Sequence, residues 1–349
     1  MTTTTTTTGR RRRIIIIDFL QLTRSHTAPS EMFGLPLAAY LGGVPPVQLP
    51  AFVLLGWLVH NAGFGMNSLV DYLYGYDLSD PSKSHHPLVA GRMSVLGATA
   101  SVFGLQLLSM FYFFMLSPHA LMSQVAFGLY VLFGWAYNLL AKKNKWAAMG
   151  YLGVSMGSLF FAGATVLGVV TPLIIAASLY TAATVVFQIG VCGDLKDLAA
   201  GTEEVNILKQ LGTHVEGTTM VTSRKGYIFA FSISAAKTAF LALFAYFVLP
   251  SWWWSIPVTV LAGATFFFFS YKELEGGRPY DHVYRLKLIG LGEVLAYILL
   301  IISAFPLLLS WALPAGIFFF ILPVAYYYVM NRVIWPKPTT GGSGWAPGV

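Results

Sequence analysis

Residues 172–193 read PLIIAASLYTAATVVFQIGVCG, an apolar run without a charged side chain, and Asp194-Leu195-Lys196-Asp197 follows at once. A run of about twenty apolar residues is long enough to cross ~30 Å of hydrocarbon as a helix that rises ~1.5 Å per residue. The crossing segment must be helical, because an isolated strand in lipid leaves its backbone groups without hydrogen bonds. The stretch therefore predicts a membrane-spanning helix that ends in a pair of carboxylates.

The rest of the chain has the same character. Of its 349 residues 56% are hydrophobic and only 10% are charged, whereas soluble domains have ~25% charged residues, so a water-soluble fold is excluded. The predicted fold class is all-α, a polytopic transmembrane helical bundle. We predict spans near residues 32–44, 51–72, 95–116, 120–141, 147–169, 172–193, 227–249, 253–271, 286–305 and 309–331.

The loops between these spans alternate in charge. Under this assignment every Lys and Arg except Lys237 falls on the side of the N-terminus, and basic loops mark the cytoplasmic side of a membrane protein. The net charge of +7 thus reflects orientation in a lipid bilayer, and we expect no nucleic-acid partner. We expect residues 1–22 to be a disordered basic cytoplasmic N-terminus, 23–332 a single transmembrane domain and 333–349 a disordered tail.

The acidic residues gather on the same face as the basic loops, mainly after the second and sixth spans. Asn67 and Asp71 are four residues apart and share one helix face, with His60 two turns earlier on that stripe. Polar side chains are costly in lipid, so this stripe should face a polar cavity within the bundle. Asp77 follows shortly after, and Asp194 and Asp197 occupy the corresponding end of the sixth span.

Two carboxylate clusters at equivalent helix ends fit Mg²⁺, which is usually held by one or two carboxylates together with substrate phosphate oxygens. The metal would neutralise a diphosphate and help it to leave. The predicted metal ligands are Asn67, Asp71, Asp77, Asp194 and Asp197, and all of them except Asp77 are also predicted catalytic residues. Lysine and arginine side chains on the same face would balance the remaining phosphate charge, among them Lys83, Arg92, Lys143 and Lys196.

Two charged residues lie inside predicted spans instead of at their ends. Lys237 and Glu293 either form a buried structural pair or mark a transport path, because ionisable groups within a membrane are costly and often functional. Aromatic residues are numerous, and the faces of those that line the cavity can stabilise a carbocation. The sequence alone does not say which ones do so.

The pattern resembles the UbiA superfamily of intramembrane prenyltransferases over roughly residues 20 to 305. Asn67, Asp71 and Asp77 match the spacing of the family's first aspartate-rich motif in its menaquinone-type branch, and Pro87-Leu88 with Gly91-Arg92 resembles the stretch after it. Tyr137-Asn138 followed by Lys142-Lys143 is similar to the loop after the fourth helix, which implies that Tyr137 and Asn138 also bind the diphosphate. Gly193 to Asp197 with the segment 206–212 resembles the second motif.

The resemblance implies a nine-helix core, to which 309–331 adds a tenth helix. It implies Mg²⁺-dependent transfer of an isoprenyl group from an isoprenyl diphosphate to a hydrophobic acceptor. Two departures from the family pattern, Ser68 and Gly201 in place of aspartates, each remove a carboxylate and leave a related membrane-bound terpene cyclase as an alternative. Asp80, Glu203 or Glu204 could substitute for them. A cation-coupled transporter is the alternative from another class.

Overall fold

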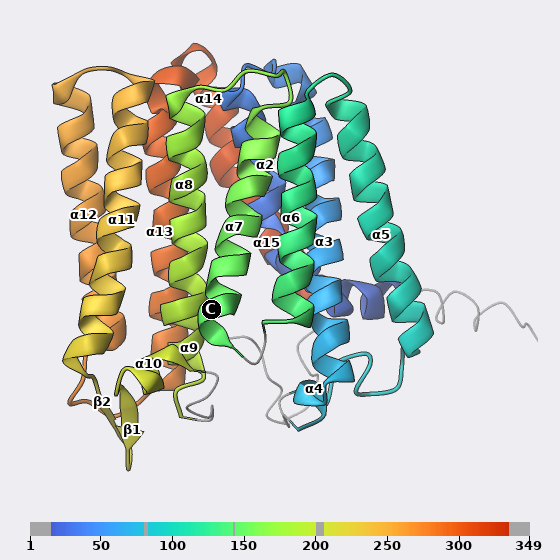
Figure 1. The fold of residues 1–349 in the computed structure, drawn as a ribbon, viewed down its shortest axis with the longest axis vertical. Coiled ribbons are helices and arrows are strands. Elements are labelled where there is room, and N and C mark those ends of the chain that lie inside the picture. The colour runs from blue at the N-terminus through green and yellow to red at the C-terminus, as the bar shows by residue number, and fades with distance from the viewer. Residues whose placement is uncertain (1–14, 80–82, 142–143, 200–205, 335–349) are drawn as a thin grey trace, which may run out of the picture. The chain divides into compact units, whose positions relative to one another are not determined.

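The computed structural model of the chain describes residues 15–79, 83–141, 144–199 and 206–334. Long helices dominate these residues, and the strands are confined to one short hairpin (Figure 1). Seven helical stretches among the described residues are long and apolar enough to cross a membrane. The predicted all-α, multi-pass membrane bundle is therefore confirmed. By its contacts the chain divides into two compact units.

Unit 1 comprises the chain up to His119 together with the segment from Gly316 onward. Its long helices are α2 (Pro29–Leu41), α3 (Leu49–Leu73) and α5 (Val95–Leu116), and α15 (Leu322–Ile334) packs against α2. The short elements are η1 (Ser25–Thr27), η2 (Pro46–Gln48), α4 (Tyr76–Ser79) and the π-helical turn η7 (Ile317–Ile321).

Unit 2 comprises Ala120–Ala315 within the chain. Its long helices are α6 (Leu121–Leu139), α7 (Lys145–Ala164), α8 (Pro172–Phe187), α11 (Arg224–Val248), α12 (Trp252–Leu274) and α13 (His282–Leu308). A π-helical segment, η4 (Gln188–Gly193), continues α8 directly into α9 (Asp194–Lys196). Shorter elements complete the unit: α10 (Ile207–Gln210), β1 (His214–Glu216), β2 (Thr219–Val221), η6 (Leu309–Trp311) and α14 (Ala312–Gly316).

Local sequence explains where the helices begin and break. A side-chain oxygen accepts a hydrogen bond from a first-turn N–H at the start of five long helices, contributed by Ser94, Asn144, Thr171, Ser223 and Asp281. The tenth predicted span, 309–331, is a series of 3₁₀, α and π turns instead of one regular helix. Pro314 and Pro323 lie within it, and each proline removes a backbone donor from the helical ladder.

The N-terminal segment differs from the prediction. Residues 15–22, which we expected to be disordered, are helical, and the side chain of Leu22 at the end of this helix is completely buried. Gln21 donates a hydrogen bond of 3.0 Å to the carbonyl of Ile334 at the end of α15, so this helix is anchored within unit 1. The prediction of disorder for 1–14 and 335–349 lies outside the described residues, and Val333 and Ile334 belong to α15 and not to the tail.

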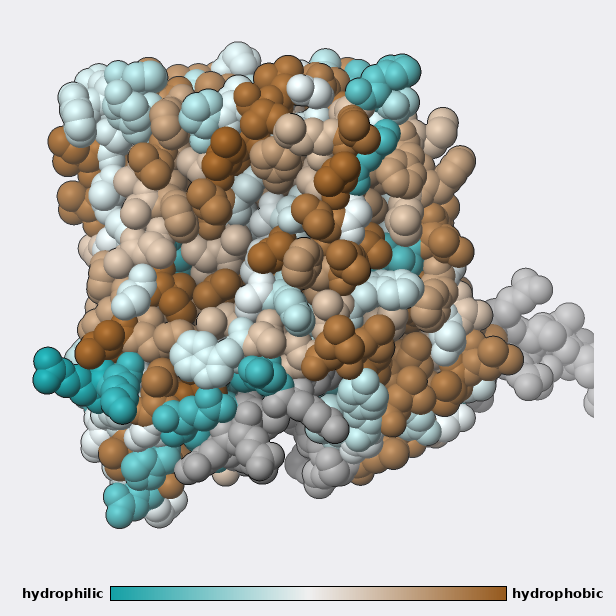
Figure 2. Space-filling model, in the orientation of Figure 1, coloured by the Kyte–Doolittle hydropathy of each residue, from teal (hydrophilic) through white to brown (hydrophobic). Residues whose placement is uncertain are grey.

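The long charged connection 194–226 folds into small elements at one end of unit 2. The β1–β2 hairpin lies at the same end as α9 and α10 (Figure 1). Hydrophilic side chains gather there, while the helical surface beside it is mostly hydrophobic (Figure 2). An apolar cluster that includes Val191, Leu195, Leu208 and Met220 packs beneath these elements, so the end that carries the second aspartate motif has a core of its own.

Close packing of α2 on α3 depends on Gly56. A Cβ atom at this position would meet the backbone oxygen of Glu31 at 2.3 Å. Gly56→Ala should therefore destabilise the protein by ~1–3 kcal/mol, the usual cost of overpacking, measured as a lower thermal unfolding midpoint in detergent. Gly104→Ala is the matched control, because nothing lies within 4 Å of the added Cβ. An equal midpoint for both variants would contradict this account of the contact.

Candidate active site

The first aspartate motif occupies the last two turns of α3. Asn67 and Asp71 are both half-buried there, as their spacing on one face predicts. Ser68, which stands where the family usually has an aspartate, is completely enclosed, and its hydroxyl has no hydrogen-bond partner among the described residues. A carboxylate at this position would have to be accommodated in an enclosed space, which the smaller serine fills without a charge.

Asp77 follows in α4 and is almost fully buried. Its Oδ2 lies 3.9 Å from Nδ1 of His86, a residue of the loop that leads to α5. Burial, followed by nearby cationic residues, lowers the pKa of His86 to about 3. His86 is therefore neutral at physiological pH and does not supply a counter-charge to Asp77.

Arg92, a predicted diphosphate ligand, already holds several protein groups. Its Nε donates to Oδ1 of Asp18 at 2.7 Å, and one terminal nitrogen donates to Gln21 Oε1 at 2.7 Å and to the carbonyl of His85 at 2.9 Å. The guanidinium thus ties the N-terminal helix to the loop after the first motif. Lys83, another predicted phosphate ligand, lies half-buried in the same loop.

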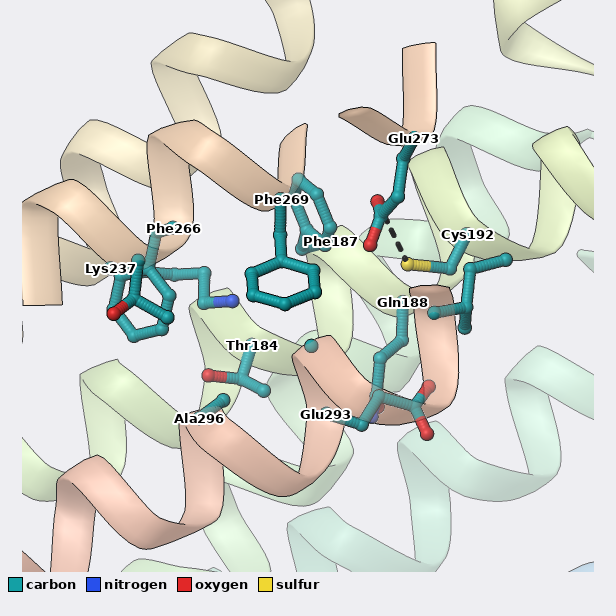
Figure 3. Close-up of a pocket in the computed structure, with 13 residues that line it drawn as sticks. Thr184, Phe187, Gln188, Cys192, Lys237, Phe266, Phe269, Glu273, Glu293 and Ala296 are labelled. Carbon is teal, nitrogen blue, oxygen red and sulfur yellow. Dashed lines mark hydrogen bonds between the residues drawn. The ribbon is translucent and has the colours of Figure 1, made fainter. Parts of the chain in front are cut away.

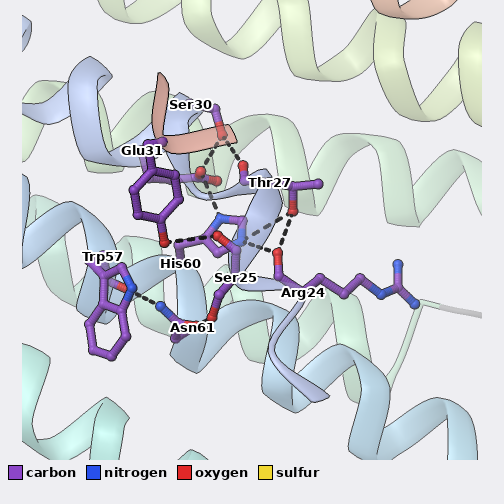
Figure 4. A network of polar contacts seen from close by, with 9 residues as sticks. Arg24, Ser25, Thr27, Ser30, Glu31, Trp57, His60 and Asn61 are labelled. Carbon is purple, nitrogen blue, oxygen red and sulfur yellow. Dashed lines mark hydrogen bonds and ion pairs between the residues drawn. The ribbon is translucent and has the colours of Figure 1, made fainter. Parts of the chain in front are cut away.

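His60, the earliest polar residue on the α3 stripe, has a structural role. Its Nδ1 lies 2.9 Å from Glu31 Oε2, and its Nε2 lies 3.3 Å from both the Thr27 hydroxyl and the Arg24 carbonyl (Figure 4). Asn61, the next residue, accepts a hydrogen bond from Ser25 and donates one to the Trp57 carbonyl. These contacts join η1 and α2 to α3 and satisfy polar groups that lipid could not.

The second motif begins where α8 widens into the π-helical segment η4. π-Helical turns are rare and often occur at functional sites. Gly190 allows α7 and α11 to approach this segment, because a Cβ there would meet Met149 Sδ at 2.6 Å and Phe229 at 3.1 Å. The extra residue in the wide turn sets the direction in which Asp194 points at the start of α9.

Asp194 is enclosed, and both of its carboxylate oxygens have protein neighbours. Oδ1 forms an ion pair of 3.0 Å with Nζ of Lys145, the first residue of α7, and Oδ2 accepts the backbone N–H of Ile207. Asn206 donates to the Asp194 carbonyl at 2.7 Å while its own Oδ1 accepts the Lys209 amide and begins α10. The segment after the second motif thus folds back and fixes Asp194.

Tyr280 holds the same motif from the loop between α12 and α13. Its hydroxyl lies 2.7 Å from the Leu195 carbonyl and 3.0 Å from the Lys196 carbonyl, to which it can donate. The loop itself is paired to β2, since the amide of Tyr280 donates to Thr218 and that of Met220 donates to Arg278. Burial, followed by the nearby Asp197 carboxylate, raises the pKa of Tyr280 to about 12, so the phenol keeps its proton.

The remaining predicted residues have different environments. Asp197 and Lys196 are exposed, so Asp194 and Asp197 do not share one environment despite their spacing. Asn138 is buried at the end of α6, with its Nδ2 bonded to the Gly134 carbonyl and its Oδ1 without a partner in the described chain, and Tyr137 beside it is half-buried. Lys143 lies outside the described residues, as do Asp80, Gly201, Glu203 and Glu204.

Sequence reasoning missed Tyr280. It is separated from Leu195 by 85 residues, and no local pattern distinguishes it from the other tyrosines. Lys145 is one of several lysines on the basic face that the sequence does not distinguish, although it is the one that pairs with Asp194. Its position at the first turn of α7, directly after the capping residue Asn144, would have been the available signal.

The donor chemistry of the two motifs fits a hard cation. Carboxylate and amide oxygens are the ligands that Mg²⁺ prefers, and it is seldom held by a complete protein cage. No group of three or more potential His, Cys, Asp or Glu ligands occurs within the described residues. Asn67 and Asp71 would hold the ion at the end of α3, and Asp194 at the start of α9.

The fold and these residues define a class of protein: an integral multi-pass membrane protein of helices, two of which end in aspartate motifs. The sequence matches the model of the UbiA prenyltransferase family over residues 32–282. The chain belongs to this family, whose members are membrane transferases of prenyl groups. None of the curated protein sequences matches the chain.

Two solved structures are similar to this chain. A structure described as digeranylgeranylglyceryl phosphate synthase in membranes is 16% identical, with a TM-score of 0.52, and the match covers 83% of this chain and 96% of that one. A UbiA homologue from Archaeoglobus fulgidus is 18% identical, with a TM-score of 0.43, over 91% of this chain and 99% of that one. At this identity the first structure supports the fold alone.

The Tyr280 contacts lead to a prediction about the second motif. Tyr280→Phe removes the hydroxyl from the carbonyls of Leu195 and Lys196, which should cost ~0.5–1.5 kcal/mol and loosen residues 194–198. Hydrogen exchange of the backbone amides in this segment should become faster, and the thermal midpoint should fall. Tyr284→Phe, which removes the hydroxyl of an exposed tyrosine four residues later, is the control. Unchanged exchange in Tyr280→Phe would show that the hydroxyl does not hold the motif.

Proposed function

We propose that this chain is a Mg²⁺-dependent intramembrane prenyltransferase, which moves an isoprenyl group from an isoprenyl diphosphate to a hydrophobic acceptor. The observation that carries the proposal is the placement of Asp71 and Asp194 at the ends of α3 and η4, in a chain of the UbiA prenyltransferase family. Both carboxylates lie at the ends of long apolar helices, where charged side chains are costly and often functional.

In this proposal the residues hold the metal ion and balance the negative charge of the diphosphate. When bound, Mg²⁺ would neutralise the diphosphate and make it a better leaving group. Asn67 and Asp71 provide oxygen ligands on one helix face, and Asp194 provides another that Lys145 and the Ile207 amide hold in a fixed orientation. Lys83 and Lys196 are the described lysines proposed to bind the phosphate oxygens directly, with Lys143 as a further candidate.

Arg92 has a narrower part in this proposal. Three of its hydrogen bonds already go to Asp18, Gln21 and His85, while its side chain remains 36% exposed. A guanidinium has five N–H donors in a fixed fork, so the exposed part can still reach a phosphate. Substrate binding at Arg92 would then also depend on the helix of residues 15–22, through Asp18 and Gln21.

The proposed orientation places the N-terminus and both motifs on the cytoplasmic side. Its support is the distribution of basic residues, which fall almost entirely in the loops on that side. The isoprenyl tail would lie among the apolar helices, where its transfer from the bilayer involves little loss of hydrophobic contact. The same distribution of charge supports a lipid bilayer as the surroundings of the protein.

The decisive experiment measures diphosphate release. Purified protein is incubated with Mg²⁺ and labelled geranyl, farnesyl or geranylgeranyl diphosphate, with and without aromatic or lipid acceptors. We expect release that depends on an acceptor, stops with EDTA and returns with added Mg²⁺. Release with formation of a cyclic hydrocarbon in the absence of any acceptor would identify a terpene cyclase instead. No release under any condition would overturn enzymatic function and favour a transporter.

Two substitutions test the aspartates in this assay. Asp71→Ala and Asp194→Asn should each lower the rate of release by about 100-fold or more, as expected when a group that stabilises developing charge is removed. Asparagine is chosen at 194 because its oxygen can still accept the Ile207 amide and preserve the fold. Glu216→Ala, which removes an exposed carboxylate from β1, should retain the wild-type rate. Near-normal turnover in both aspartate variants would refute the metal-site assignment.

A further inference from the structure

Unit 2 contains a polar pocket within its helices, separate from the carboxylates of the second motif. It is lined from α8 and η4 by Thr184, Phe187, Gln188 and Cys192, from α11 by Lys237, from α12 by Phe266, Phe269 and Glu273, and from α13 by Glu293 and Ala296 (Figure 3). Its volume of about 20 Å³ is enough for one oxygen-sized group, such as a water or a hydroxyl.

Lys237 is the unusual member of this lining. It lies near the middle of α11 with only 5% of its surface exposed. Its ammonium lies over the rings of Phe266 at 4.1 Å and Phe187 at 4.7 Å, and it has no hydrogen-bond acceptor within the described residues. Contacts with aromatic faces leave its three N–H donors unsatisfied, and an unsatisfied buried charge is costly.

Two carboxylates border the same space without reaching the ammonium. Within the described part of the chain, neither Glu273 nor Glu293 forms an ion pair with Lys237, so the structural pair, one of the two interpretations of Lys237 and Glu293, is not present. Glu273 is 1% exposed, and its Oε2 is the acceptor for the Cys192 thiol at 3.8 Å. Glu293 is exposed along α13, so the pocket is open on this side.

The arrangement restricts what can occupy the pocket. The missing partner of Lys237 must accept hydrogen bonds, which excludes an ammonium or metal cation. An anion would meet the two neighbouring carboxylates and be repelled by them. A neutral hydroxyl satisfies both conditions, because it accepts from the ammonium and donates to a carboxylate.

We propose that this pocket binds the hydroxyl end of a neutral, largely apolar alcohol or phenol. The remainder of the ligand would extend past the open Glu293 side, since the pocket has room for the oxygen alone. Phe187, Phe266 and Phe269 would contact the first carbons of the ligand. That this ligand is the prenyl acceptor rests on the proposed function; its binding does not.

The neighbourhood of the pocket supports a functional rather than a purely structural role. One wall is η4, the π-helical segment that ends directly before Asp194. Gly292 also contributes, because a Cβ there would lie 3.3 Å from Glu273 Oε1. Occupation of the pocket would therefore press on the segment that directs the second motif.

The test compares three probes that differ only in their polar end: dodecanol, dodecanoate and dodecylammonium. The full-length protein is placed in lipid nanodiscs, and its thermal unfolding midpoint is measured with each probe, because a ligand that binds only the folded state raises this midpoint. We expect dodecanol to raise the wild-type midpoint by several degrees and the two charged probes to leave it unchanged.

Variants that alter the charge of the pocket should then change which of the three probes stabilises the protein. Lys237→Met should raise at least tenfold the dodecanol concentration required for a given increase in the midpoint. Dodecylammonium should become the better ligand of this variant. Glu293→Gln, which keeps the size and shape of the side chain, should allow dodecanoate to stabilise the protein. Lys225→Met, which removes an exposed lysine from the same helix, should behave as the wild type does.

Any one of three results would overturn the proposal. The first is no midpoint shift with dodecanol in the wild type, which would mean that the pocket holds water. The others are equal dodecanol shifts in the wild type and Lys237→Met, and an unchanged probe preference in Glu293→Gln. None of these measurements requires turnover. A preference that changes as expected in a protein that releases no diphosphate would keep the pocket and reject the prenyltransferase. Acceptor-dependent diphosphate release without any probe preference would support the prenyltransferase and reject the proposed pocket ligand.

Discussion

The absence of water from the interior of a bilayer is the constraint on which this structure depends. Backbone groups in hydrocarbon must find partners within their own segment, and among the described residues long helices meet that demand. Departures from regular helix are consequently confined to particular places. The π-helical segment Gln188–Gly193 comes directly before Asp194, and the broken stretch after Leu308 contains prolines that cannot continue the ladder.

The same constraint applies to side chains, and many buried polar groups among the described residues are held by a hydrogen bond or an ion pair. In unit 1 the pairing of His60 with Glu31 and of Asn61 with Ser25 joins the first elements to α3. In unit 2 Lys145, Asn206 and Tyr280 converge on the short segment 194–196 from three different parts of the chain. Held from several directions, Asp194 has little freedom to reorient, which favours a preorganised ligand over a mobile one.

Lys237 departs from this rule and is informative for that reason. Its buried ammonium lies over two aromatic rings and has no hydrogen-bond acceptor within the described residues. Two carboxylates nearby make a neutral hydroxyl the most compatible partner. Such a pocket in a UbiA-family protein would select the proposed alcohol or phenol by the charge of the ligand's polar end. The surrounding apolar helices would select the ligand's length and shape.

The sequence by itself determined the helical membrane fold, the boundaries of α5 and α8 within a few residues, and the stripe that joins Asn67 to Asp71. These follow from hydrophobic length and from the 3.6-residue period, which are local properties. It also indicated Asp194 through its position at a helix end. The tertiary structure alone decided that Arg92 binds Asp18, that residues 15–22 are helical, that Tyr280 meets Leu195, and that Lys237 and Glu293 line one pocket without forming an ion pair. These contacts join residues far apart in the chain, and no local periodicity encodes which distant helices pack together.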